Sequence, residues 1–161
     1  MTLAIRPTSP DHPQVQALIA ELDAYLASLY DPQDVYILDL AGLMLPSVTF
    51  LGAWSGEALV GCGAVRQMPA EPATGGRRYG EIKRMFVSPA RRGERIGQQV
   101  LDALEQGLRR DGVDRALLET GPPQVEALKL YERCGYVRRA AFGGYPDIPA
   151  SVFMEKRWTT D

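Results

Sequence analysis

The chain has 161 residues, about the length of one domain. Apolar residues make up 45% and charged residues 24%, with 18 basic and 20 acidic side chains, which excludes a disordered chain. No apolar run reaches the roughly 18 residues that a membrane-spanning helix needs. We therefore expect a single globular domain over residues 1–161 that folds without disulfide or metal support.

The first residues and the cysteines both indicate a cytoplasmic protein. Residues 1–13 lack the basic start and the long apolar run of a secretory signal. Cys62 and Cys134 are too few for a disulfide framework, and their spacing is not that of metal ligands. We predict no metal site.

Basic residues gather in the middle of the chain. Residues 1–76 hold two basic and eight acidic residues, whereas residues 77–161 hold 16 basic and 12 acidic ones. A basic centre in a slightly acidic chain argues against nucleic-acid binding, which requires a strongly basic domain. It favours a compact anionic ligand, with a solvated surface of ion pairs as the alternative.

The first 68 residues predict strands, one long helix and one short one. The long helix begins at Pro13, and its apolar residues recur every three or four positions as far as Leu29. Asp11 is available as its N-cap. A hairpin turn is expected at Ser55–Gly56. The other elements are strands over 3–6, 47–54 and 57–68 and a short helix within 35–43.

The second half predicts alternating strands and helices after an exposed loop over 68–78. The strands are expected over 79–87, 115–120, 136–140 and 151–158, and the helices over 96–110 and 124–133. Gly112 and Gly135 are suitable helix stops. One apolar stripe follows the longer helix and consists of Ile96, Val100, Leu101, Leu104 and Leu108. This order of elements predicts a mixed α/β sheet with helices on both faces.

The loop before the helix expected over residues 96–110 has the features of a phosphate site. It carries arginines and glycines between Arg91 and Gly97 and leads directly into the helix. The first turn of a helix has free N–H groups and a partial positive charge, and glycine lets an anion approach closely. We predict a phosphate or pyrophosphate seat between Arg92 and Gln98, with an exposed charged turn as the alternative.

Two common nucleotide-binding motifs are absent from the sequence. There is no GxxxxGK(S/T), and the loop is not GxGxxG. Gly61 and Gly63 lie within a predicted strand, where they do not form a dinucleotide-binding turn.

The segment RRGERIGQQVL resembles motif A of the GCN5-related N-acetyltransferases (GNAT family), whose pattern is R/Q-x-x-G-x-G/A. The resemblance implies that the backbone of the preceding strand contacts the pantetheine of acetyl-CoA and that the loop contacts its pyrophosphate. Arg95 stands where the motif has its central glycine, and its side chain can reach a phosphate. The strand positions are Met85, Phe86 and Val87, and the loop positions are Arg92, Gly93, Glu94, Arg95, Ile96 and Gly97.

The segment ETGPPQVEALKLYERCGY is similar to motif B of the same family. Gln124 stands where asparagine is usual and is a further expected cofactor contact. Motifs A and B together resemble the YsnE-type branch of the family over roughly residues 48–157, with three further matching segments, TFLGAWSGEALVGCGAV, GEIKRM and PASVFM. The resemblance implies a mostly antiparallel sheet with a central splayed pair of parallel strands. The residues that match motif B are Ala127, Leu130, Tyr131, Gly135 and Tyr136.

The resemblance implies transfer of an acetyl group from acetyl-CoA to an amine by direct attack, without a metal. Tyr131 is the expected proton donor to the leaving thiolate, with a core tyrosine as the alternative. Glu81 is the expected general base, unless it is a carboxylate paired with Lys83 or Arg84. A backbone N–H near Phe86 is the expected donor to the oxyanion.

The acceptor is expected to be a primary amine of a small metabolite or amino acid, because the sequence has no nucleic-acid or membrane feature. The alternatives are a non-catalytic module that senses acyl-CoA and an enzyme that acetylates protein lysines or N-termini. Tyr145 either lines the acceptor side or packs, and His12 is expected at the surface or as a cap. A homodimer is expected because final strands in this family often pair between subunits.

Overall fold

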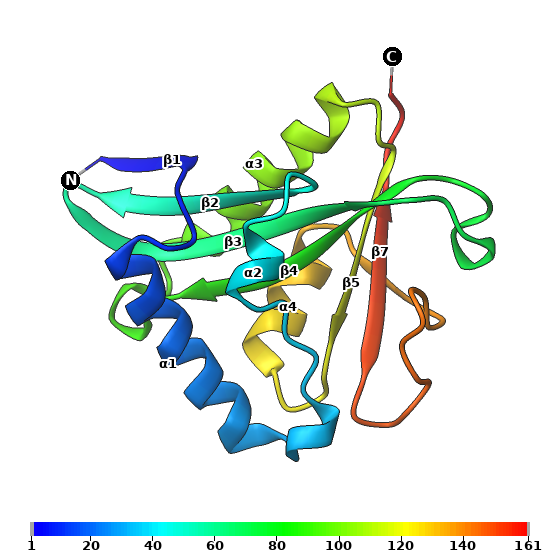
Figure 1. Ribbon diagram of the computed structural model, residues 1–161, viewed down its shortest axis with the longest axis horizontal. Helices are drawn as coiled ribbons and strands as arrows, with labels where there is room; N and C mark the ends of the chain where they lie inside the picture. Colours follow the sequence, from blue (N-terminus) through cyan, green and yellow to red (C-terminus); the bar gives the residue numbers. More distant parts are fainter. Residues whose placement is uncertain (1, 161) are drawn as a thin grey trace. The chain divides into compact units, whose positions relative to one another are not determined.

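The computed structural model describes residues 2–160 and contains one seven-stranded sheet in the order β1-β2-β3-β4-β5-β7-β6 (Figure 1). The strands are β1 (Leu3–Pro7), β2 (Val48–Ser55), β3 (Ala58–Met68), β4 (Tyr79–Val87), β5 (Arg115–Thr120), β6 (Val137–Arg139) and β7 (Val152–Arg157). The helices are α1 (Pro13–Leu29), α2 (Leu40–Leu43), α3 (Ile96–Arg110) and α4 (Val125–Arg133). Short 3₁₀ turns cover Pro32–Asp34, Pro72–Thr74 and Pro89–Arg91.

The sheet is mixed and mostly antiparallel, as predicted. β1 pairs with β2, β2 with β3, and β7 with both β5 and β6 in antiparallel fashion. β4 and β5 form the parallel pair in the middle of the sheet, and their register comprises Gly80↔Ala116 and Glu81↔Leu117. This register comprises two residues of each strand, although β4 has nine residues and β5 has six. A pairing this short fits two strands that splay apart, as expected.

The internal contacts divide the chain into two compact units. The first unit comprises the chain up to residue 66 together with residues 83–104, and the second comprises residues 67–82 together with the chain from residue 105 onward. The single domain expected over residues 1–161 stays a prediction. Within residues 2–160, no helix is long and apolar enough to cross a membrane.

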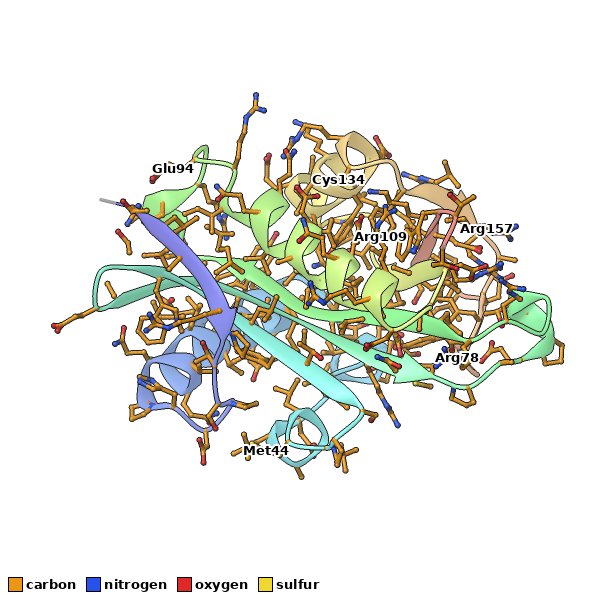
Figure 2. All side chains as sticks on the ribbon, turned by 90° about the horizontal axis from the view of Figure 1, so that it is seen from above. Met44, Arg78, Glu94, Arg109, Cys134 and Arg157 are labelled. Atoms are coloured by element: carbon orange, nitrogen blue, oxygen red, sulfur yellow. The ribbon has the colours of Figure 1, made fainter. Side chains whose placement is uncertain are left out.

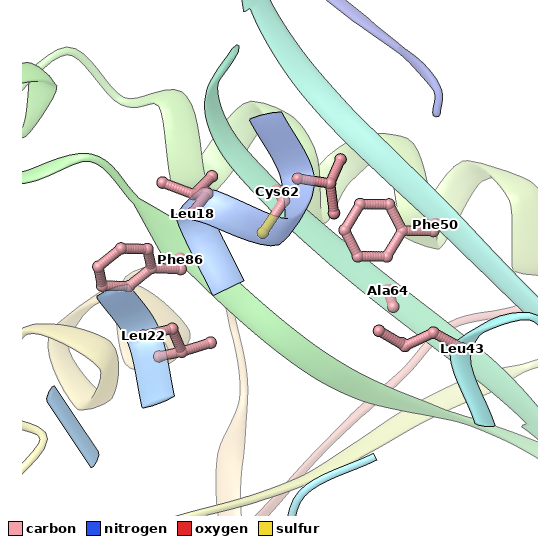
Figure 3. Packing of buried hydrophobic residues seen from close by; sticks show 8 residues of the cluster. Leu18, Leu22, Leu43, Phe50, Cys62, Ala64 and Phe86 are labelled. Atoms are coloured by element: carbon pink, nitrogen blue, oxygen red, sulfur yellow. The ribbon is translucent and has the colours of Figure 1, made fainter. Parts of the chain in front are cut away.

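In the first unit, helices pack on both faces of β3. Cys62 and Ala64 lie in an apolar cluster with side chains of α1, α2, β2 and β4 (Figure 3). Gly61 and Gly63 alternate with these residues along β3 and lie on its other face, against α3. A Cβ at Gly63 would lie 2.8 Å from Cγ1 of Val100, so only glycine lets α3 approach this closely. The α3 stripe predicted from the sequence is buried along its whole length.

Two local predictions, the N-cap of the first helix and the position of the hairpin turn, need correction. The N-cap of α1 is His12, whose Nδ1 accepts from the backbone N–H of Gln14 at 3.1 Å, because Pro13 occupies the first helical position. Asp11 instead accepts from the Ser9 hydroxyl. The hairpin turn lies one residue later than expected because β2 continues through Ser55, and Gly56 adopts φ +60°.

The short helix expected within residues 35–43 occupies less of that range. α2 begins at Leu40 because the carboxylate of Asp39 accepts from the backbone N–H of Gly42 and caps the helix there. Residues 32–34 form the separate 3₁₀ turn. The later elements match their expected bounds closely, with β6 and β7 shorter at their ends.

The core of the second unit consists of aromatic side chains packed against β5. Tyr79, Phe142 and Phe153 surround Leu117, and Tyr145 packs at the margin of the cluster. The ring of Phe142 meets those of Tyr79, Tyr145 and Phe153 in edge-to-face contacts, with centroid distances of 5.6, 5.5 and 5.8 Å. Phe142 and Tyr145 therefore anchor the loop that follows β6.

Candidate active site

The loop between β4 and α3 belongs to the first unit and lies at the surface. After the 3₁₀ turn Pro89–Arg91, the chain is extended at Arg92 and takes positive φ at Gly93 (+88°) and Arg95 (+60°). Figure 2 shows Glu94 on this loop, where it forms an ion pair with Arg91. The backbone enters α3 directly after Arg95, whose carbonyl accepts from the N–H of Gln99. The loop thus ends at a helix N-terminus, which favours anions.

The backbone at Arg95 explains why motif A has a glycine at this position. A φ of +60° is open to glycine without steric cost and is unfavourable for residues with a Cβ. Arg95 adopts this conformation although it is not glycine. The departure from the motif therefore keeps the backbone shape that a glycine would take and adds an exposed guanidinium.

The side chains of Met85 and Phe86 point to opposite faces of β4 and are used in packing. Phe86 belongs to the apolar cluster under α1, whereas the sulfur of Met85 lies against Gly63 on the α3 face. Arg92 folds back on this strand, with Nε 3.4 Å from the Val87 carbonyl and the guanidinium over the Phe86 ring at 5.5 Å. Because these side chains are used in packing, we expect a ligand to contact the backbone of β4, which is the role that the resemblance implies.

Helix α3 carries one unusual polar group in its first turn. The Oε1 atom of Gln98 is buried and has no hydrogen-bond partner within residues 2–160. Buried polar atoms are nearly always paired in folded proteins. A bound ligand with an amide N–H would satisfy this oxygen, which makes Gln98 a suitable contact for the amides of a pantetheine.

Glu81 lies in the second unit, on the part of β4 that pairs with β5. Its side chain is only 4% exposed, and Oε2 accepts a hydrogen bond from the hydroxyl of Tyr145 at 2.5 Å. Burial and the negative charge of Glu81 raise the pKa of Tyr145 far above its ordinary value, so the phenol stays protonated. The pairing with Arg84 that the sequence left open is not formed, because the Arg84 guanidinium binds Asp23 of α1.

Tyr145 is the contact that sequence reasoning did not assign. Its segment FGGYPDIP was expected to line the acceptor side or to pack, and neither alternative paired it with Glu81. The two residues are 64 positions apart, so no local pattern connects them. Its ring packs against Phe142 and Phe153, so the packing role is confirmed.

Tyr131 is buried on α4 in the second unit. Its ring lies 5.8 Å from that of Tyr136, and burial raises its pKa well above the ordinary value for a phenol. The hydroxyl is therefore protonated at neutral pH, as a proton donor must be, and a core tyrosine would be buried in the same way. Gln124 occupies the N-cap position of α4 without capping it through its side chain.

Neither cysteine forms a disulfide, and Cys62 lies deep in the first unit. Burial raises the pKa of its thiol to about 12. A thiol with this pKa is protonated at neutral pH and is a poor nucleophile.

The loop and its neighbours match a known family. The model of the Acetyltransferase (GNAT) family matches residues 15–136, well over half of the chain. The chain belongs to the GNAT acetyltransferase family. An IAA acetyltransferase of Azospirillum brasilense is 43% identical over 148 residues, covering 92% of this chain and 93% of that protein. The N-acetyltransferase YsnE of Bacillus subtilis is 34% identical over 146 residues, with 89% and 92% covered, which agrees with the expected branch of the GNAT family.

Solved structures show the same GNAT fold. A crystal structure from Klebsiella pneumoniae, assigned as an acyl-CoA N-acyltransferase, is 36% identical and superposes with a TM-score of 0.79 over 97% of both chains. The PaiA N-acetyltransferase of Thermoplasma acidophilum, solved with coenzyme A, is 18% identical and superposes with a TM-score of 0.74, covering 98% of this chain and 100% of that one. The protein is thus an enzyme of the N-acetyltransferase class, with a fold that binds coenzyme A in other members.

Proposed function

We propose that the protein transfers the acetyl group of acetyl-CoA to a primary amine of a small metabolite or amino acid within a ternary complex. The observation that carries the proposal is the loop of residues 92–97, whose positive φ angles lead into the N-terminus of α3. Such a loop presents backbone N–H groups to an anion, as the pyrophosphate of acetyl-CoA requires. The likeness to an IAA acetyltransferase that is 43% identical supports a small acceptor.

The residues of the chain fit this co-substrate. The exposed loop offers backbone donors and the side chains of Arg92 and Arg95, and the buried Oε1 of Gln98 has no hydrogen-bond partner among the described residues 2–160. Acetyl-CoA supplies the thioester whose carbonyl carbon the amine attacks. Amide donors from the backbone around Phe86 would stabilise the negative charge on the carbonyl oxygen during this attack.

Glu81 and Tyr131 are the proton acceptor and the proton donor in this proposal. The amine must lose a proton as its C–N bond forms, and the buried carboxylate of Glu81 is the acceptor in this proposal. The C–S bond breaks in the same reaction, and the phenol of Tyr131 gives its proton to the leaving sulfur. The raised pKa of Tyr131 means that the phenol carries its proton at neutral pH.

The test begins with calorimetric titration of the protein with acetyl-CoA, coenzyme A and NADH. We expect micromolar binding of acetyl-CoA and coenzyme A and none of NADH. Acetyl transfer is then measured with free amino acids, small amines and a lysine-containing peptide. Transfer to a free amine supports the proposal, and transfer to the peptide alone would make the protein a protein acetyltransferase. Binding of acetyl-CoA with transfer to none of them would favour the sensing module.

The expected homodimer and the cytoplasmic location stay predictions. Both rest on the sequence alone. Size-exclusion chromatography with light scattering measures the first directly.

A further inference from the structure

Two tyrosine–carboxylate pairs lie in the aromatic cluster of the second unit. The hydroxyl of Tyr145 donates to Oε2 of Glu81 at 2.5 Å, and that of Tyr79 donates to Oε2 of Glu71 at 3.0 Å. Both tyrosine rings meet the ring of Phe142 edge-on, at centroid distances of 5.5 Å and 5.6 Å. The pairs have the same chemistry, and only one of them involves the expected general base.

The Tyr145 hydroxyl is held in place by contacts other than Glu81. The backbone N–H of Gly143 donates to Oε1 of Glu71 at 2.7 Å, which anchors the start of the segment. The backbone N–H of Tyr145 donates to the carbonyl of Phe142 at 3.0 Å, closing a turn through Gly143 and Gly144, both with positive φ. The Tyr145 ring also packs against Phe153. The segment therefore presents the phenol oxygen at a defined position.

Glu81 in turn depends on hydrogen-bond donors. Glu81 is only 4% exposed, so its carboxylate oxygens lose most of their hydration and need hydrogen-bond donors from the protein to fix their orientation. The Tyr145 phenol keeps its proton, because burial and the charge of Glu81 raise its pKa, and so it remains a donor. Its contact fixes Oε2 from one side.

We propose that Tyr145 is a positioning residue, whose hydroxyl holds the Glu81 carboxylate in the orientation that takes the proton from the acceptor amine. This role rests on the proposed function of Glu81. As the amine nitrogen bonds to the acetyl carbon, its proton moves to Glu81, while Tyr145 donates a hydrogen bond throughout and neither gains nor loses a proton. The Tyr79–Glu71 pair anchors the segment and takes no part in proton transfer.

The test compares two matched variants, Tyr145→Phe and Tyr79→Phe. Each removes one phenol hydroxyl and keeps a ring that contacts Phe142. With the best free amine of the panel, we expect Tyr145→Phe to lower kcat about tenfold while KM for the amine and the dissociation constant of acetyl-CoA stay within twofold. Tyr79→Phe is expected to lower the thermal midpoint and to leave kcat within twofold.

A double variant shows whether Tyr145 acts through Glu81. Glu81→Gln should lower kcat strongly, and adding Tyr145→Phe to it should cause no further loss. A second full loss in the double variant would overturn the positioning role, because Tyr145 would then act on its own. Equal kcat values for Tyr145→Phe and Tyr79→Phe would overturn it as well.

The outcomes also separate this inference from the proposed function. If the wild-type protein transfers acetyl groups and Glu81→Gln abolishes transfer, unchanged kcat in Tyr145→Phe refutes the positioning role alone. Full activity of Glu81→Gln refutes Glu81 as the base and the role of Tyr145 with it. Absence of transfer by the wild-type protein refutes the proposed function and removes the reaction that Tyr145 would serve.

Discussion

Replacing Arg95 by glycine should make the protein more stable. Arg95 has φ +60° in the exposed loop before α3, and a residue with a Cβ is strained there by about 1–2 kcal/mol. Glycine removes that strain, but it lowers the free energy of unfolding by about 0.5–1 kcal/mol because it makes the unfolded chain more flexible. The net effect is a free energy of unfolding that is higher by about 0.5–1 kcal/mol. For a chain of 161 residues it corresponds to a rise in Tm of about 1–4 °C.

Arg92→Gly is the matched control, because the two arginines are three residues apart in the same exposed loop. Arg92 has φ −71° and ψ 152°, an extended conformation that any residue adopts. Glycine relieves no strain there and loses the same backbone entropy, about 0.5–1 kcal/mol. It also loses the contacts of Arg92 with the Val87 carbonyl and the Phe86 ring. The two variants should therefore shift Tm in opposite directions.

The assay is thermal unfolding followed by circular dichroism without ligand, repeated as urea unfolding at 25 °C. Both variants remove one positive charge, so the change in net charge cancels in the comparison. Equal Tm values for the two variants, or a lower Tm for Arg95→Gly than for the wild type, would refute the reasoning from backbone strain. The same Arg95→Gly protein then shows what the guanidinium adds to acetyl-CoA binding, because the backbone already has the conformation that glycine favours.

Three further substitutions and one control variant test the site and the core. Tyr131→Phe should lower kcat at least tenfold, about 1.4 kcal/mol of barrier stabilisation, with acetyl-CoA affinity unchanged in calorimetry; an unchanged kcat would remove Tyr131 from the chemistry. Gly97→Val should weaken acetyl-CoA binding by adding side-chain bulk at the start of α3, and tight binding by this variant would mean that the pyrophosphate lies elsewhere. Asp23→Asn should lower the free energy of unfolding in urea by about 1–2 kcal/mol. The side chain of Arg84 is 4% exposed, and this variant leaves its guanidinium without the carboxylate that binds it. The loss is limited because the side chain of Asp23 is itself half-exposed. Glu94→Gln, which breaks an ion pair at the surface, should change stability much less, and equal losses would contradict the role given to burial.

Elements that depend on local patterns could be predicted from the sequence. The bounds of β4, α3 and β5 match the expected ones because apolar periodicity and the stop at Gly112 are properties of neighbouring residues. The arginine–glycine loop was predicted for the same reason, since its residues and the helix that follows are contiguous. The errors at Asp11 and Ser55 are shifts of one residue: Pro13 takes the first helical position and so makes His12 the N-cap, and β2 continues through Ser55.

The contacts of Glu81 and Arg84 could not be predicted in this way. Glu81 binds Tyr145, 64 positions away, and Arg84 binds Asp23, 61 positions away, and no pattern along β4 indicates either partner. Both carboxylate contacts are made by elements that meet only when the chain packs. A buried charged group pairs with whichever partner the packing brings within hydrogen-bond distance, and sequence separation does not enter that choice.

The sequence by itself determined the family, the element order and the loop suited to an anion, because motif spacing and hydrophobic periodicity are written in short stretches of chain. Only the tertiary structure decided that Gly61 and Gly63 admit α3 against β3, and that the hydroxyl of Tyr145 donates a hydrogen bond to Glu81. These features depend on distances between segments far apart in the chain. Such distances are set by the packing of the core, in which every side chain constrains the position of its neighbours.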